Sequence, residues 1–229
     1  MSGFVIGPIG VLPTGGSPSV PLALDGTPVR TFLGGGGVLT VTSGAVTTTA
    51  GDIMVVAVMN GGQAISSVVG SVNGSYAQLG STGNVSGGLA DLWWVLATGG
   101  PTETITVNQA SGSFCEFLAF GVVGCDTSSP WDPLTGSGFV LNGVFHSTGP
   151  TITPTASVPV MLIGAGSDPG GSGPYTADSG WTTNTGFSDT VVSGLVERNI
   201  QAAGAGALTF NSTNRFLAGG IGAALKQHP

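Results

Sequence analysis

The sequence predicts an all-β fold, an antiparallel β-sandwich or jelly-roll-like domain. Short apolar runs alternate with turn-rich segments along most of the chain, and none of the runs has helical periodicity. Glycine supplies 42 of the 229 residues and proline 14, so long regular helices are disfavoured. Short strands at this spacing, separated by such turns, are typical of sandwiches and jelly rolls.

Residues 1–37 differ from the remainder and are predicted to form an extended N-terminal arm. The segment is interrupted by Pro and Gly yet remains apolar, whereas disordered tails are usually polar. Asp25-Gly26 could turn a short hairpin, and Gly34 to Gly37 could act as a hinge. We expect the arm to anchor on a partner, and the alternative is that it folds back on its own domain. Its candidate anchoring residues are Phe4, Val5, Ile6, Ile9 and Leu12.

Residues 38–229 are predicted to form the β-sandwich domain. Its candidate strands are short and mostly apolar, and they follow one another at regular intervals. They are 38–42, 52–59, 65–72, 89–97, 104–109, 114–123, 159–166, 189–197, 207–211 and 216–225.

The strand pattern occurs twice, which indicates an internal duplication. DIMVVAV, GSYAQLGS, LADLWWVLATGG, TITVNQ and FCEFLAFGVV are followed roughly 100 residues later by PVMLIGAG, SGWTTNTG, TVVSGLVERNIQAAG, ALTFNSTN and RFLAGGIGAAL. The match is in order and type rather than in identity. Two copies of one unit could close a single core between them.

Several strands are apolar on both faces. In FCEFLAFGVV both alternating sets of side chains are apolar, and in LADLWWVLA the rings of Trp93 and Trp94 point to opposite faces. A strand exposed on one face should alternate apolar with polar residues. We therefore expect one tryptophan to lie outside a two-sheet core, under a loop or under a neighbouring subunit.

Charge is scarce. Only 7% of the residues are charged, against roughly 25% in ordinary soluble domains. This predicts that much of the surface is covered by other protein in a homo-oligomer or larger assembly, and the alternative is a monomer with a neutral Ser/Thr-rich surface. The net charge of −7 excludes a basic nucleic-acid footprint. No apolar run is long enough for a membrane span, and the start lacks the basic segment of a secretory signal.

Catalytic and metal sites are weakly indicated, and we expect a non-enzymatic protein without a cofactor. Glu103, Glu116, Asp126 and Asp132 could include a glycosidase pair, but no E-x-D-x-E strand motif occurs. His146 and His228 are the two histidines, without a G-x-S-x-G motif. The loop acids, including Asp168 and Asp178, lack calcium-loop spacing, so no metal is predicted. Cys115 and Cys125 could pair, but a cytoplasmic origin favours free thiols.

The stretch VVGCDTSSPWDP is predicted to be a structural corner. Asp126 and the following hydroxyl residues can accept or cap backbone N–H groups where a strand ends, and Pro130 and Pro133 prevent its continuation. Trp131 can cover the open end of the sandwich. Trp131, Tyr175 and Trp181 are also candidates for stacking on a glycan or contacting a partner, against the alternative of packing plugs at strand ends.

Four segments together resemble a β-sandwich domain of tailed-phage virion proteins that also occurs in bacterial surface proteins. They are GDIMVVAV (51–58), GSYAQLG (74–80), LADLWWVL (89–96) and VVGCDTSSPWDP (122–133). The resemblance covers about 51–226 and leaves the arm unmatched. It implies a fold used in decoration, fibre and adhesion modules. Cys125 and Trp131 depart from its usual small aliphatic residue and leucine, so it implies no ligand preference.

These observations favour a virion structural protein, made in the host cytoplasm and incorporated into the particle. The leading hypothesis is a capsid decoration (cement) protein that oligomerises and bridges neighbouring subunits. Its partners would be other virion proteins, either the major capsid protein or tail components. The alternative is a tail-fibre or surface adhesin that binds host surface glycans.

Overall fold

The computed structural model describes residues 19–84, 87–132, 148–168, 180–188, 193–211 and 219–229. Within them the protein is built from strands and turns, which confirms the all-β prediction. The candidate anchoring residues Phe4, Val5, Ile6, Ile9 and Leu12 lie outside the described residues, as does Tyr175.

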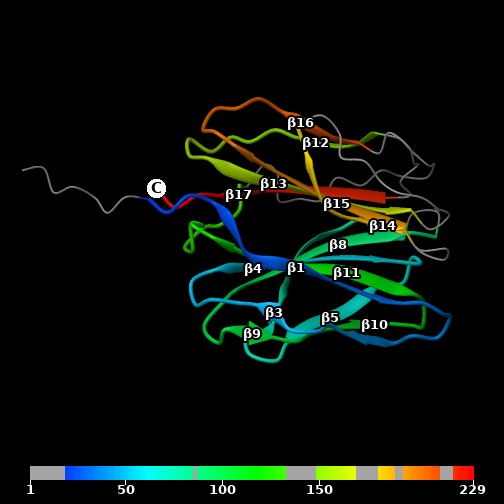
Figure 1. Cartoon of the computed structure of the whole chain (residues 1–229). Helices are drawn as coiled ribbons and strands as arrows, with labels where there is room; N and C mark the ends of the chain where they lie inside the picture. Colours follow the sequence, from blue (N-terminus) through cyan, green and yellow to red (C-terminus); the bar gives the residue numbers. More distant parts are fainter. Residues whose placement is uncertain (1–18, 85–86, 133–147, 169–179, 189–192, 212–218) are drawn as a thin grey trace, which may run out of the picture.

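Three sheets form the body of the molecule, stacked one on another (Figure 1). The central sheet has the order β1-β11-β4-β8-β7, from β1 (Ala23–Leu33), β4 (Ile53–Asn60), β7 (Ala77–Ser81), β8 (Leu89–Leu96) and β11 (Cys115–Val123). The flanking sheet has the order β2-β10-β5-β6, from β2 (Thr40–Thr42), β5 (Ile65–Gly70), β6 (Gly74–Ser75) and β10 (Ile105–Gln109). The C-terminal sheet has the order β14-β15-β13-β17, from β13 (Val160–Asp168), β14 (Thr182–Ser188), β15 (Ser193–Gln201) and β17 (Gly219–Lys226).

Two small strand pairs complete the fold. The capping pair consists of β12 (Thr148–Ile152) and β16 (Leu208–Asn211), and β3 (Val46–Thr47) pairs with β9 (Thr102–Glu103). All pairings are antiparallel.

The central sheet is buried on both faces by the chain itself. Met54, Val56 and Val58 of β4 pack toward the flanking sheet, while the alternate residues Val55 and Ala57 pack toward the C-terminal sheet. Side chains along a strand alternate between its two faces. Every residue of β4 is buried, because both of these faces are covered. The two-faced apolar pattern therefore comes from a third layer within the chain.

The two tryptophans of β8 follow the same rule. Trp93 packs in the core between the central and flanking sheets, and Trp94 packs against the core between the central and C-terminal sheets. The expectation that one of them needs a loop or a neighbouring subunit is corrected by this arrangement.

The strand order repeats in the two halves, in line with the predicted duplication. The central sheet runs β11-β4-β8-β7 and the C-terminal sheet runs β17-β13-β15-β14, with corresponding strands roughly 100 residues apart. In the second half the capping pair, β12 and β16, occupies the place in the strand order that β2 and β10 occupy in the first half. Its residues Ile152 and Leu208 cover the outer face of the C-terminal sheet together with Trp181.

Part of the predicted arm belongs to the body. Residues 23–33 form β1, which pairs with β11 along the edge of the central sheet, so the boundary at residue 37 lies too far along the chain. Asp25-Gly26 makes a register shift within one strand, between Asp25 and Val29, and not a hairpin. For this stretch the alternative of folding back on its own domain is the one observed.

Candidate functional site

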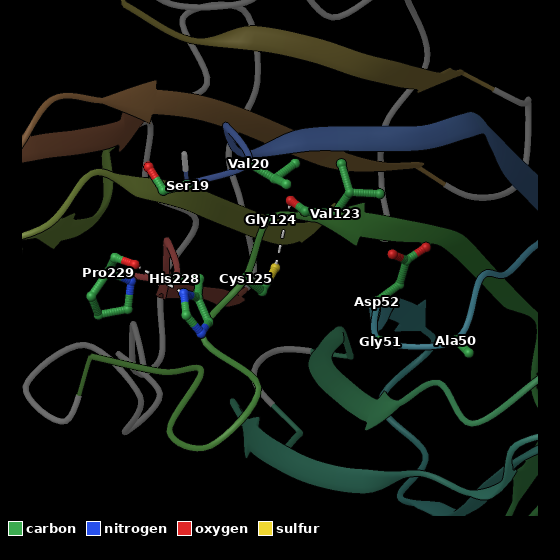
Figure 2. A pocket seen from close by; sticks show the side chains of 10 residues that line it. All are labelled: Ser19, Val20, Ala50, Gly51, Asp52, Val123, Gly124, Cys125, His228 and Pro229. Atoms are coloured by element: carbon green, nitrogen blue, oxygen red, sulfur yellow. Dashed lines mark hydrogen bonds between the residues drawn. The ribbon is translucent and has the colours of Figure 1, made fainter. Parts of the chain in front are cut away.

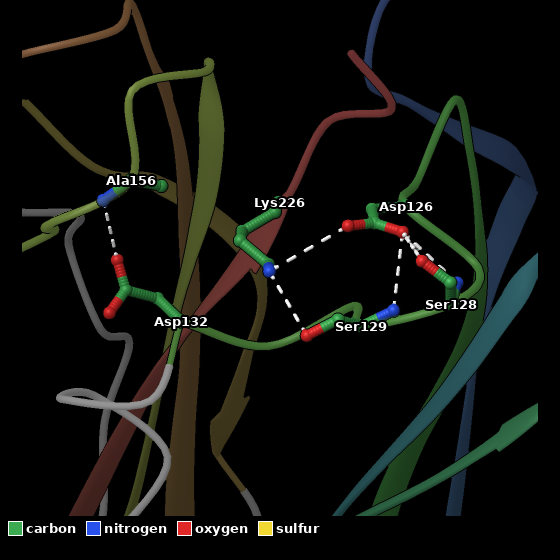
Figure 3. A network of polar contacts seen from close by, with 6 residues as sticks. All are labelled: Asp126, Ser128, Ser129, Asp132, Ala156 and Lys226. Carbon is green, nitrogen blue, oxygen red and sulfur yellow. Dashed lines mark hydrogen bonds and ion pairs between the residues drawn. The ribbon is translucent and has the colours of Figure 1, made fainter.

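The corner after β11 is held by local hydrogen bonds to Asp126 (Figure 3). Its Oδ1 accepts hydrogen bonds from the Ser128 N–H at 3.0 Å, the Ser128 hydroxyl at 2.7 Å and the Ser129 N–H at 3.2 Å. Its Oδ2 lies 3.7 Å from Lys226 Nζ, and these contacts lower the pKa of Asp126. Such Asx capping was predicted from the sequence and is confirmed.

The corner also joins the two halves of the molecule through its backbone. The Asp126 N–H donates to the Lys226 carbonyl at 3.0 Å, and the Lys226 N–H donates to the Pro130 carbonyl at 2.7 Å. The Asp132 N–H donates to the Ala224 carbonyl at 2.9 Å. Residues 125–131 therefore run beside the end of β17 and protect that edge of the C-terminal sheet.

Asp132 is fully buried and caps the segment that leads into β13. It accepts hydrogen bonds from the Thr155 N–H at 2.7 Å, the Thr155 hydroxyl at 2.8 Å and the Ala156 N–H at 2.8 Å. The last contact is visible in Figure 3. A buried carboxylate with three donors is a structural anchor, since the donors compensate its lost hydration.

The candidate aromatic residues are packed. Trp131 is half-buried, and its ring meets Trp94 edge-on with centroids 6.0 Å apart and an interplanar angle of 74°. Trp181 is 6% exposed and lies in the core under the capping pair, so its ring is not open to a sugar in this chain. The glycan-binding hypothesis requires that at least one of the rings of Trp131, Tyr175 and Trp181 is exposed. Tyr175 lies outside the described residues.

A hollow of about 580 Å³ opens where the first described residues meet the C-terminal end (Figure 2). Its lining includes Val20, Asp52, Cys125 and His228. The Cys125 thiol is 4% exposed and donates to the Val122 carbonyl at 3.3 Å, and burial raises its pKa to about 12. Because the thiolate is the reactive form, this cysteine is poorly suited to nucleophilic catalysis.

Both cysteines are free and buried. Burial also raises the pKa of Cys115 to about 12. Free thiols, rather than a disulfide between Cys115 and Cys125, were favoured by the sequence, and this prediction is confirmed.

Glu103 is tied into a network between strands. It is 3% exposed and accepts hydrogen bonds from the Tyr76 hydroxyl at 2.6 Å, the Asn73 side-chain amide at 2.9 Å and the Asn73 N–H at 3.1 Å. Burial, followed by the neighbouring Glu103, raises the pKa of Tyr76.

Glu116 lies in a different environment, in β11, where it is fully buried and forms an ion pair with Arg30 of β1. Together with the anchoring roles of Asp126 and Asp132, this places the four acids that were considered for a glycosidase pair in separate structural contacts. None of these contacts pairs two of them across the hollow.

Two further buried acids were missed by the sequence reasoning. Burial raises the pKa of Asp91 to about 6. Burial, followed by a hydrogen bond to and repulsion from Asp25, raises the pKa of Asp52 to about 6. A lone Asp inside an otherwise apolar strand, as in LADLWWVL, was the available signal for Asp91.

The part of the chain that the structure describes contains no group of three or more His, Cys, Asp or Glu side chains placed to hold a metal ion. Over the same residues, no helix has the length and apolar character needed to cross a membrane. Comparisons with protein-family models, with curated proteins and with solved structures gave no match.

Proposed function

We propose that this chain is a non-enzymatic virion structural protein of the capsid-decoration type, as its residue pattern suggested. The observation that carries the proposal is the shortage of charge on the part of the surface that the structure describes, in a chain with 7% charged residues. Of the eleven acids, Asp52, Asp91, Glu103, Glu116 and Asp132 are buried. Among charged residues whose side chains the structure describes, Arg30 alone is exposed.

A neutral exterior suits repeated protein contacts. The centre of a protein–protein interface is depleted of charged residues, because each charge would lose its hydration when the interface closes. Exposed Ser, Thr and Asn side chains can hydrogen-bond to a partner without that cost. On the flanking sheet, for example, Thr40, Thr42, Thr106 and Asn108 form a hydroxyl and amide surface.

The fold changes how such a protein would bind its neighbours. The faces of the central sheet are used inside the chain, so they cannot bridge capsid subunits. Contacts with the shell would use the outer surfaces and the apolar segment that precedes Ser19. Exposed apolar side chains that could take part include Val20, Leu33 and Leu39.

The binding test uses purified protein added to shells assembled without it. We expect saturable binding at regular lattice positions, visible by electron microscopy. Because few ion pairs would contribute, affinity should change less than about tenfold between roughly 0.05 and 0.5 M salt. Failure to bind such shells, or a steep loss of binding with salt, would overturn the proposal.

Removal of residues 1–18 sharpens the test. The shortened chain should keep its thermal unfolding transition but bind the shell more weakly. A glycan array serves as the control for the adhesin alternative, and we expect no binding to it because Trp131 and Trp181 are packed.

A further inference from the structure

Three strands bring two aspartates together beside β1. Asp25 of β1 lies opposite Gly121 of β11, and Asp52 immediately precedes β4, which pairs with the other side of β11. Asp52 is 4% exposed, whereas Asp25 is half-buried at the edge of the sheet.

The two carboxyl groups share one small space. Both bind Thr49, whose hydroxyl donates to Asp25 Oδ2 at 2.8 Å and whose N–H donates to Asp52 Oδ2 at 3.3 Å. A side chain on Gly121 would begin 3.4 Å from Asp25 Cβ and 3.4 Å from Asp52 Oδ2. Both acids therefore lie directly beside Gly121.

The surroundings offer little positive charge. Among the described residues, the neighbouring titratable groups are Cys125, which lies within electrostatic reach of Asp52, and His228, which lines the hollow with Asp52. Lys226 is engaged by Asp126 and Ser129. Two adjacent carboxylates in such a setting repel each other, and a shared proton removes the repulsion.

We propose that Asp25 and Asp52 form a proton-dependent latch, which holds the first part of β1 on the central sheet in acid and loosens it at neutral pH. The register shift after Asp25 separates this part, residues 23–25, from the second part, Val29–Leu33. The second part has its own anchor in the ion pair between Arg30 and Glu116. The first part can therefore loosen while the second stays paired.

The direction of the effect follows from the raised pKa of Asp52, about 6. An acid whose pKa is raised by folding contributes stability that is fully present below its unfolded value and is lost as pH rises through its folded value. The latch should thus weaken as pH rises from about 4 to just above 6.

Amide hydrogen exchange of the full chain tests the latch. After correction for intrinsic exchange rates, peptides covering residues 21–26 should lose protection by about tenfold or more from pH 5 to pH 7.5. Peptides from β4 and β8 should change less. Asp25→Asn should reduce the pH-dependent loss, because Asp52 no longer faces a second carboxylate, whereas its burial remains.

Matched variants separate the latch from other titrating groups. Asp91→Asn removes another acid with a raised pKa, and His228→Asn removes the histidine of the hollow, so both variants should keep the pH-dependent loss. Equal protection of residues 21–26 at the two pH values in the wild type would overturn the proposal. An undiminished loss in Asp25→Asn, which alters a half-buried edge residue and should fold, would overturn it as well.

Discussion

The two halves of this molecule have the same strand order but use their faces differently. In the first half the central sheet is enclosed between the flanking and C-terminal sheets. In the second half the C-terminal sheet packs on the central sheet, and the two-stranded capping pair covers its other face. Two units with the same strand order thus stack on each other, so that one unit supplies the layer that the other lacks.

The halves also differ in their buried charge. The first half buries Asp52, Asp91, Glu103 and Glu116, whereas Ser167 is the buried polar residue in the described part of β13 to β17. Asp132, in the connection between the halves, is the fifth buried acid. The pH dependence of stability should therefore originate mainly in the first half.

The largest expected effect comes from the contact between the halves. Phe120 of β11 is 1% exposed and packs toward the C-terminal sheet. Phe120→Ala should lower the free energy of unfolding by about 3–5 kcal/mol, because it leaves a cavity in a closed core. Urea denaturation measures this change.

The control is Phe117→Ala, at a fully buried residue three positions earlier in the same strand on the opposite face. It should destabilise the protein by a similar amount. A loss below about 1 kcal/mol for Phe120→Ala alone would mean that the halves touch only loosely.

The connection between the halves should be the next most sensitive position. Asp132→Ala leaves the Thr155 and Ala156 N–H groups without their acceptor, and we expect a loss of about 3 kcal/mol. Asp126→Ala, at the partly exposed acid of the same corner, should cost less than about 1 kcal/mol. Thermal or urea unfolding of both variants checks the order, and a reversed order would contradict the anchoring role of Asp132.

A smaller effect of opposite sign is expected at Asp91. Among the described residues its Oδ1 has no hydrogen-bond partner, while its Oδ2 accepts from Gln78 at 3.3 Å. Because its pKa is raised to about 6, the ionised form destabilises the fold above that pH. Asp91→Asn should raise the free energy of unfolding by about 1–3 kcal/mol at pH 7.5 and by little at pH 4.

The measurement is urea denaturation of wild type and variant across this pH range. The two stability curves should converge in acid. A variant less stable than the wild type at pH 7.5 would show that the carboxylate is satisfied in the fold.

The sequence predicted the parts of the fold that depend on local pattern. The longer apolar strands, the repeated strand order and the Asp126 turn follow from alternation, spacing and short-range hydrogen bonding, whereas β7, β12 and β14 were not among the candidate strands. The pairing of β1 could not be predicted, because it depends on a free sheet edge formed by residues some 90 positions later in the chain. Two-faced burial in β4, β8 and β11 was evident, but a sequence does not say whether the covering layer belongs to the same chain or to a partner.

The acidic sites show the same limit. The capping of the turn by Asp126 could be predicted from DTSSP, because its partner Ser128 is two residues away. The contact of Asp132 with Thr155 could not be predicted in this way, because the two residues are 23 positions apart. Asp25 and Asp52 likewise come together only when β1 and β4 pair with opposite sides of β11.

The central claim is that the two halves share one core and unfold together. Differential scanning calorimetry of the full chain at pH 5.5 tests it most directly, through the ratio of calorimetric to van't Hoff enthalpy. We predict a single transition with a ratio near one, which moves as a whole to lower temperature in Phe120→Ala. Two separable transitions, with only one of them shifted by that substitution, would contradict the claim.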